Sequence, residues 1–389
     1  MSPEPSVLID NAREAPGHAS LYENPREVIR ADVAGEVSGA LAAMERARAS
    51  GTHLAGFLSY ELGYALEPRF ARMMPGGRAV PLLWFGVFSQ ARSLVGREIE
   101  DYLNASATGG YQLSEPVLTM SAADYGARFE KAKNYIAAGD IYQINLTLKG
   151  RFNVTGDPAA LYLDLRRKQP VSSGALLRTA DFTVISASPE LFLDIAGERI
   201  VTRPMKGTAG RGLTRDHDAE ISQWLTDDLK SRAENLMIVD LMRNDLGRVA
   251  RTGSVRVSDL FTVETYETLH QMTSGVEARL TAGMDIARLL ESVFPPGSVT
   301  GAPKVRAMEI IRELETEPRG VYTGALGAIS PDGEARFNVA IRTLTLFPGG
   351  AAEIGIGSGV VHDSGAKEEY DECLLKMRFL TDPVRDFQL

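Results

Sequence analysis

Three short apolar segments follow one another with only turn residues between them, and no other feature restricts the fold of this chain as strongly. Residues 182–186, 191–195 and 198–202 contain the β-branched and aromatic side chains that favour strands. The turn Ser188-Pro189-Glu190 joins the first two segments. This spacing predicts a hairpin with Glu190 at its tip, followed at once by a third strand.

A lysine lies in the glycine-rich stretch directly after the third segment. The order is Arg203-Pro204-Met205-Lys206-Gly207-Thr208, and two further glycines follow within four residues. Proline fixes the backbone at the entry of this loop, and glycine lets the chain pass close to a neighbouring group. A lysine amine is a nucleophile only when it is neutral, which requires burial or a nearby cation. Two interpretations therefore stand, a nucleophile and an ordinary exposed loop lysine.

The charge and composition of the chain exclude several classes of function. Its 389 residues carry a formal net charge of −9, which argues against nucleic acid, because phosphate contacts need a basic surface. No apolar run is long enough to cross a membrane, and the N-terminus lacks the pattern of a signal peptide, so we expect a cytoplasmic protein. The single cysteine, Cys373, excludes an intramolecular disulfide. A small anionic substrate is still compatible with local clusters of Arg and Lys.

An acid lies at the start of an apolar helical run. Residues 218–242 have the pattern of one long helix or two, and the run 236–242 is apolar on nearly every side, which indicates a buried helix. Glu234 begins this run, and a buried carboxylate needs a partner. Two interpretations have similar weight, a salt bridge with Arg232 or Lys230 and a role as a metal ligand.

A second group of acids follows a strand with glycines. The strand 352–361 is interrupted by three glycines, which weaken a strand unless something must approach its backbone, and a ligand is the obvious candidate. The next helix carries Glu369, Glu372 and Lys376 on one stripe. The simpler interpretation is an exposed face with a favourable Glu372–Lys376 pair. Carboxylates from two separate helices, without a histidine cluster, are the ligands of a hard cation, so we expect Mg²⁺ rather than zinc.

Several polar groups elsewhere suit an anion or a cleft, although none is specific alone. The segment 295–304 opens a helix, so that its backbone amides and Lys304 lie at a positive helix end. Gln143 and Asn145 alternate with apolar residues along a predicted strand and become hydrogen-bonding groups if that face lines a cleft.

Four blocks of the sequence resemble the signature blocks of the chorismate-utilising enzymes. They are residues 234–245, Thr300-Gly301-Ala302-Pro303-Lys304, Gly355-Ile356-Gly357-Ser358-Gly359 and Glu369-Tyr370-Asp371-Glu372. The resemblance runs in the right order from about residue 125 to residue 379, and it is looser in the N-terminal third. It implies an α+β fold with a large antiparallel β-sandwich core flanked by helices. Residues 1–115 are then a strand-rich part of the same sandwich, and residues 116–389 are the chorismate-binding catalytic region.

The resemblance also implies a set of site residues. Glu234 and Glu369 match positions that bind Mg²⁺, and Glu372 matches one that supports the metal through water. Tyr322 and Arg342 match positions that hold the enolpyruvyl carboxylate of chorismate. The full substrate-binding set implied by the family is His270, Thr300, Gly301, Lys304, Tyr322, Arg342, Gly357, Gly359 and Lys376.

Two positions suggest a branch within the family. Pro204-Met205-Lys206-Gly207-Thr208 resembles the aminodeoxychorismate synthases, whereas anthranilate synthases usually carry alanine at that lysine. Gln143 replaces the lysine that activates water in isochorismate and salicylate synthases. The resemblance therefore implies amination of chorismate by ammonia to 4-amino-4-deoxychorismate, with Lys206 as a covalent nucleophile and Glu190 as the proton donor.

This prediction implies a partner and leaves alternatives open. A glutamine amidotransferase of the common type needs a cysteine nucleophile, and Cys373 lies in a helical pattern after the acidic stripe, so we expect a separate glutaminase subunit to supply ammonia. The alternatives are anthranilate synthase component I and a ligand-binding protein that retains the fold without turnover.

Overall fold

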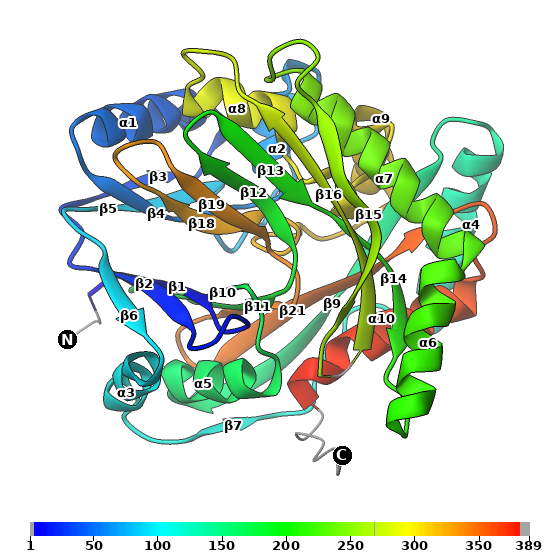
Figure 1. The fold of residues 1–389 in the computed structure, drawn as a ribbon, viewed down its shortest axis with the longest axis horizontal. Helices are drawn as coiled ribbons and strands as arrows, with labels where there is room; N and C mark the ends of the chain where they lie inside the picture. The colour runs from blue at the N-terminus through cyan, green and yellow to red at the C-terminus, as the bar shows by residue number, and fades with distance from the viewer. Residues whose placement is uncertain (1–3, 268, 382–389) are drawn as a thin grey trace.

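The computed structural model describes residues 4–267 and 269–381, which form two antiparallel sheets packed face to face with helices outside (Figure 1). Every strand pair within these residues is antiparallel. The α+β sandwich that the resemblance implied is thereby confirmed.

The first sheet contains strands from both ends of the chain. Its order is β17 (Gly301–Ala302), β9 (Gln143–Gly156), β21 (Ala351–Val360), β20 (Thr343–Leu346), β11 (Thr183–Ser188), β10 (Ser173–Arg178), β1 (Ser6–Asn11), β2 (His18–Glu23) and β6 (Arg92–Val95). Two short strands, β7 (Tyr111–Leu113) and β8 (Val117–Leu118), also pair with β9.

The second sheet has the order β14 (Met205–Gly210), β16 (Leu269–Arg279), β13 (Arg199–Arg203), β12 (Leu191–Ala196), β19 (Ala335–Val339), β18 (Ala325–Ile329), β4 (His53–Leu58), β5 (Leu83–Phe88) and β3 (Glu27–Ala31). Strand β15 (Arg256–Thr265) pairs with β16. The N-terminal residues thus contribute β1, β2 and β6 to one sheet and β3, β4 and β5 to the other. The division of the chain at residue 115 stays a prediction.

Helices cover the outer faces of both sheets (Figure 1). They are α1 (Val37–Ala49), α2 (Leu62–Leu66), α3 (Arg97–Ser106), α4 (Ala122–Ala137), α5 (Pro158–Lys168), α6 (Arg215–Asp227), α7 (Leu229–Gly247), α8 (Ile286–Val293), α9 (Lys304–Leu314) and α10 (Ala366–Thr381). Short 3₁₀ turns occupy Ala34–Glu36, Pro68–Phe70 and Gly297–Val299.

Where a strand is covered on both faces of its sheet, it buries both sets of alternating side chains, and β5 is an example. Trp84 and Phe88 of β5 belong to the core between the sheets, whereas Phe85 and Val87 pack in the core beneath α1 and α8. All six residues of β5 are buried. This explains why the sequence of this strand is apolar throughout rather than alternating.

The predicted hairpin at Ser188-Pro189-Glu190 is wrong. Strand β11 pairs with β10 and β20 in the first sheet, whereas β12 pairs with β13 and β19 in the second. The turn therefore carries the chain from one sheet to the other. Local turn residues predict that the chain bends here, but the partners of each strand come from distant parts of the sequence.

The expected loop around Lys206 is a strand. Pro204 separates β13 from β14, and both strands pair with the same neighbour, β16. The pairing of β14 shifts register between Met205 and Thr208, which fits the positive φ of 79° at Gly207. The glycines thus allow a bulge in a strand rather than a free loop.

The acid-containing helical run forms two helices, α6 and α7, and α7 is buried on one side only. Ile238 and Val239 are buried, whereas Leu236 is 45% exposed. The expectation of a fully buried helix is therefore wrong. The mixed arrangement explains how Asp240 lies in this run, since it faces solvent and pairs with Arg243 at 2.7 Å.

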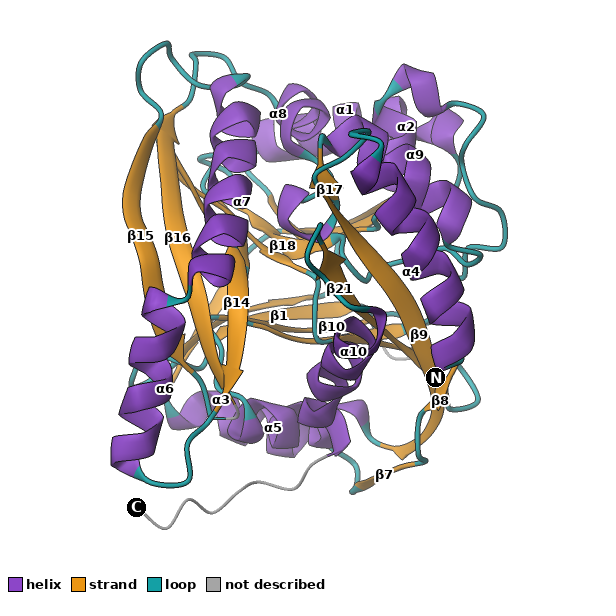
Figure 2. Ribbon diagram, turned by 90° about the vertical axis from the view of Figure 1, so that its right-hand side faces the viewer, coloured by secondary structure: helices purple, strands orange, loops and turns teal. Residues whose placement is uncertain are grey.

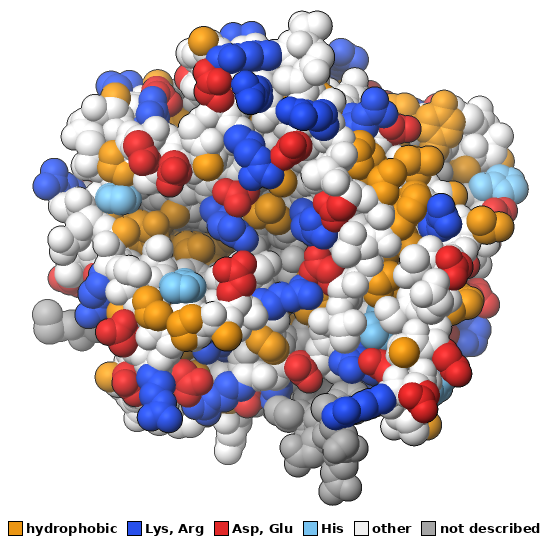
Figure 3. All heavy atoms as spheres, in the orientation of Figure 1, with side chains coloured by type: hydrophobic (Ala, Val, Ile, Leu, Met, Phe, Trp, Pro, Cys, Tyr) orange, Lys and Arg blue, Asp and Glu red, His pale blue; other side chains and the backbone are white. Residues whose placement is uncertain are grey.

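Positive and negative side chains are interspersed over the face in Figure 3, without a broad basic area there. No helix in the described ranges combines the length and the apolar character needed to cross a bilayer.

Candidate active site

Residues of β14, β21, α7 and α10 line a cavity of about 350 Å³. Figure 2 shows how these four elements are arranged. Strand β14 of the second sheet and strand β21 of the first both contribute residues to its wall. Most residues of the predicted site line it, namely Glu190, Lys206, Glu234, Tyr322, Arg342, Gly357, Gly359, Glu369, Glu372 and Lys376. The structure therefore brings together groups that lie up to 186 positions apart between Glu190 and Lys376.

Lys206 extends from β14 of the second sheet to Gly359 of the first. A Cβ atom added to Gly359 would lie 2.7 Å from the Lys206 Nζ, so only glycine leaves room for the amine at its present place. No ion pair joins Lys206 to a carboxylate among residues 4–267 and 269–381. Burial lowers the pKa of Lys206, although the carboxylate of Glu234 acts in the opposite direction. The amine is therefore closer to its neutral, nucleophilic form than an exposed lysine would be.

Glu190 is 3% exposed and sits where the chain crosses between the sheets. Its carboxylate accepts a hydrogen bond from the hydroxyl of Ser298, and its backbone carbonyl accepts one from the amide of Val339 at 3.0 Å. Burial raises the pKa of Glu190 to about 7, although Ser298 and Lys206 both favour the charged form. A carboxyl group with such a pKa can give a proton near neutral pH. Ser298 gave no separate signal in the sequence, because its contact spans 108 positions.

Tyr322 and Arg342 lie at two backbone turns that are bonded to each other. Arg342 has a φ of 48° and Thr323 a φ of 61°, a conformation that costs energy for residues other than glycine. The amide of Thr323 donates to the carbonyl of Ala340 at 2.9 Å, and the amide of Ala340 donates to the carbonyl of Gly324 at 2.9 Å. These paired turns fix the point from which both side chains enter the cavity.

Arg342 is a buried cation with no acid beside it among the residues that the structure describes. Arg342 is 9% exposed, and its Nη1 donates a hydrogen bond to the amide oxygen of Gln169 at 2.7 Å. Burial lowers the pKa of Arg342 to about 10. No carboxylate of the described residues forms an ion pair with Arg342. An anionic ligand group would therefore find an unneutralised guanidinium in the wall.

The three expected metal ligands face the same cavity from two helices. Glu234 on α7 lies 3.9 Å from Lys230, so the predicted salt bridge is present as a long contact. Glu369 is 5% exposed and accepts a hydrogen bond from Ser364, and Glu372 pairs with Lys376 at 2.6 Å. Burial raises the pKa of Glu234, and the charges of Glu369 and Glu372 raise it further.

Such mutual repulsion between carboxylates is relieved when a cation binds between them. The oxygen-only donor set fits a hard divalent ion such as Mg²⁺. Within the described ranges, however, no three His, Cys, Asp or Glu side chains converge closely enough to form a ready metal cluster.

Thr300, Gly301 and Lys304 do not line the cavity. The hydroxyl of Thr300 donates to the carbonyl of Pro296 at 2.8 Å, and Gly301 pairs with β9 in strand β17. Lys304 forms an ion pair with the buried Asp245 at 2.6 Å. These contacts hold the segment before α9 in place, so the expected helix-end anion site is occupied by the protein's own carboxylate.

His270 also lies outside the cavity wall, although its neighbours Leu269 and Gln271 on β16 are part of it. It is 1% exposed, and its Nε2 lies 2.8 Å from Asp218 Oδ1. Asp218 also pairs with Arg211 at 2.8 Å, and the hydrogen bond from this guanidinium holds the pKa of Asp218 well below the usual range. His270 thus belongs to a polar cluster behind β14.

The glycines of β21 have different reasons for being glycine. A Cβ on Gly355 would lie 2.1 Å from the ring of Tyr322, so a side chain of the protein, not a ligand, occupies that space. A Cβ on Gly359 would meet Lys206 and also lie 3.1 Å from the Gln143 Nε2. Gln143 is fully buried, and neither of its amide atoms has a hydrogen-bond partner within the described part of the chain. Its neighbour on the same strand face, Asn145, lines the cavity.

Comparison with known proteins identifies the family to which this chain belongs. The model of the chorismate binding enzyme family matches residues 9–382. The chain is 37% identical over 351 residues to aminodeoxychorismate synthase component 1 of Bacillus subtilis, covering 82% of this chain and 74% of that protein. It is 44% identical over 258 residues to the protein of the same name from Klebsiella aerogenes, covering 66% of this chain and 57% of that protein.

Relatives with another name are equally similar. Anthranilate synthase component 1 1 of Haloarcula marismortui is 40% identical over 295 residues, covering 73% of this chain and 60% of that protein. The solved structure of anthranilate synthase component I from Streptococcus pneumoniae has a TM-score of 0.76 and 26% identity, covering 98% of this chain and 91% of that one. The chain belongs to the chorismate binding enzyme family.

Proposed function

We propose that this chain aminates chorismate with ammonia to 4-amino-4-deoxychorismate. The observation that carries the proposal is the pair formed by a half-buried lysine, Lys206, and a buried acid, Glu190, in one cavity. The pKa of Lys206 is lowered and that of Glu190 is raised to about 7, so a neutral nucleophile and a proton donor can coexist. Relatives named aminodeoxychorismate synthase component 1 at 37% and 44% identity support this assignment.

The reaction proceeds in two displacements. The neutral amine of Lys206 forms a bond to carbon two of the ring, the double bonds shift, and the carbon-four hydroxyl leaves with a proton from Glu190. Ammonia then forms a bond to carbon four, and the bond between the ring and Lys206 breaks. The amine loses a proton after the first step and regains one when it departs. Covalent catalysis divides one difficult displacement into two easier ones.

The remaining cavity groups bind and orient the substrate. Arg342 and Tyr322 receive the enolpyruvyl carboxylate, and the buried guanidinium has no competing acid in the described residues. Glu234 and Glu369, with Glu372 through water, would hold Mg²⁺. When bound, this ion neutralises the ring carboxylate of the substrate.

Ammonia comes from a separate glutamine amidotransferase subunit in this proposal. The relatives carry "component 1" in their names, which implies a second component. The one cysteine of this chain, Cys373, is buried in α10, and burial raises the pKa of its thiol to about 12. A thiol of this kind cannot serve as the nucleophile of a glutaminase.

Anthranilate synthesis is the second candidate, because anthranilate synthase relatives reach 40% identity. The test is to incubate the purified chain with chorismate, Mg²⁺ and ammonium salt, and to identify the products by mass spectrometry. A mass of amino-deoxychorismate that an aminodeoxychorismate lyase converts to 4-aminobenzoate supports the proposal. Fluorescent anthranilate with pyruvate as the main products contradicts it.

A further inference from the structure

Two neutral side chains hold the guanidinium of Arg342 from behind the cavity wall. The amide oxygen of Gln169 accepts a hydrogen bond from Nη1 at 2.7 Å. The Arg342 Cζ lies 6.0 Å from the centre of the Tyr266 ring. Gln169 is 2% exposed and Tyr266 is 5% exposed, and neither lines the cavity. They therefore lie next to Arg342 but outside the wall that a bound ligand would meet.

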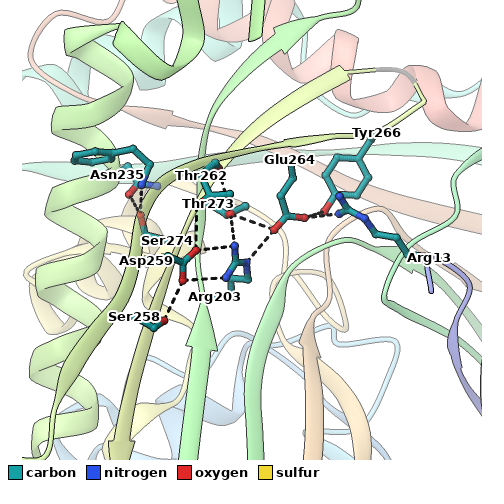
Figure 4. A network of polar contacts seen from close by, with 11 residues as sticks. Arg13, Arg203, Asn235, Ser258, Asp259, Thr262, Glu264, Tyr266, Thr273 and Ser274 are labelled. Atoms are coloured by element: carbon teal, nitrogen blue, oxygen red, sulfur yellow. Dashed lines mark hydrogen bonds and ion pairs between the residues drawn. The ribbon is translucent and has the colours of Figure 1, made fainter. Parts of the chain in front are cut away.

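Tyr266 is itself fixed by a network that reaches the N-terminal region (Figure 4). Its hydroxyl donates to Glu264 Oε2 at 2.9 Å. Glu264 also accepts from Arg203 at 2.9 Å and pairs with Arg13, whose Cζ lies 4.4 Å from the centre of the same tyrosine ring. The ring thus has an acid at its hydroxyl and the guanidinium of Arg13 beside it.

Gln169 and Tyr266 are both uncharged, and this determines whether Arg342 stays available to a ligand anion. A carboxylate behind Arg342 would pair with the guanidinium and neutralise it, so that a ligand anion would have to displace an internal one. An amide oxygen and an aromatic ring orient a cation without removing its charge. The acid of this region, Glu264, is instead engaged by two other arginines, Arg13 and Arg203.

We propose that Gln169 and Tyr266 are positioning residues that aim a charged, unpaired Arg342 at the side-chain carboxylate of chorismate. This inference rests on the proposed use of Arg342 as the anchor for that carboxylate. It does not depend on whether the ring is afterwards aminated at carbon four or converted to anthranilate.

The test compares the affinity of intact protein variants for chorismate by titration calorimetry. Gln169→Glu adds an internal anion beside Arg342, and Gln169→Met removes the acceptor at similar size. We expect Gln169→Glu to weaken binding by about tenfold to a hundredfold and Gln169→Met by a smaller factor. Tyr266→Phe keeps the ring and should bind nearly as the unchanged protein does, whereas Tyr266→Leu should bind more weakly.

Ser59→Ala is the matched control, since it removes a buried hydrogen bond to the carbonyl of Pro81 that has no link to Arg342. It should lower thermal stability without changing the affinity for chorismate. Each Gln169 variant is also measured together with Arg342→Gln, where its effect should become smaller, because the guanidinium through which residue 169 acts is absent.

Two results overturn the inference, namely unchanged affinity in Gln169→Glu and an undiminished effect of Gln169→Glu in the Arg342→Gln background. Failure of the proposed function has a different signature. In that case the unchanged protein binds chorismate and the variants keep the expected order of affinities, but mass spectrometry finds anthranilate.

Discussion

Replacing Gly359 by alanine should disable the proposed nucleophile while leaving the fold intact. The added methyl group would lie 2.7 Å from the Lys206 Nζ, whereas ordinary contact of a Cβ begins near 3.4 Å. The amine must therefore recede by about 0.7 Å. A displacement near 1 Å from productive geometry costs about 100-fold in rate. We expect the rate of chorismate amination to fall by one to two powers of ten.

The stability of the protein should change little. The two atoms that must move, the Lys206 Nζ and the Gln143 Nε2, are the ends of side chains, and the alanine reduces the conformational freedom of the unfolded chain. We expect the free energy of unfolding to stay within about 1 kcal/mol of its original value. Gly150→Ala on β9 is the matched control, because its methyl group would meet Ile354 and Met377 at 3.2 and 3.4 Å, away from the cavity.

The assay measures chorismate consumption with saturating ammonium salt and Mg²⁺, together with urea unfolding of both variants. Loss of rate in Gly359→Ala at unchanged stability, with full rate in Gly150→Ala, is the expected result. An unchanged rate in Gly359→Ala would refute the reasoning, since it would show that the amine of Lys206 is not needed at this place.

Three further predictions concern single groups of the site and its surroundings. Lys206→Ala should abolish amination but retain chorismate affinity within a few-fold, as measured by titration calorimetry. The rate, expressed per free ammonia, should rise and then fall with increasing pH, because Lys206 must be neutral and Glu190 must carry its proton. Glu190→Gln should be slow and lack the alkaline fall. Lys304→Met should leave the buried carboxylate of Asp245 without its ion pair and lower the free energy of unfolding by about 3–5 kcal/mol, while the KM for chorismate stays unchanged. A raised KM at unchanged stability would mean that Lys304 does contact the substrate.

The sequence allowed prediction of residues whose type is unusual for their surroundings. Lys206 lies among glycines, Glu234 begins an apolar run, and the stripe of Glu369 and Glu372 follows a strand with three glycines. All four face one cavity. Such local conflicts between residue type and surroundings are visible without knowledge of the fold, because they cost stability unless a partner compensates them.

The pairing of distant segments was not visible in the same way. The turn before Glu190 has residues typical of a hairpin, yet β11 and β12 belong to different sheets. Strand β11 pairs with β20, and β12 pairs with β19. The contact between Ser298 and Glu190 and that between Gln169 and Arg342 each depend on such pairing. The position of Lys304 at the start of a helix likewise suggested that it meets an anion. In the structure that anion is the carboxylate of Asp245. The periodicity of apolar residues indicates which face of a helix or strand is buried, but it does not indicate which other element covers that face.

The pairing of β9 with β21 also sets the order in which the protein can mature during translation. Gly359 pairs with Asn145, which leaves the ribosome roughly 200 residues earlier, or roughly 10–40 s earlier at the usual rate of synthesis. During that interval the long edge of β9 lacks its central partner, and exposed strand edges favour aggregation. Lys206 likewise lacks the glycine surface over which its amine rests. A nascent or truncated chain should therefore depend on chaperones and be catalytically silent until β21 and the carboxylates of α10 have been made.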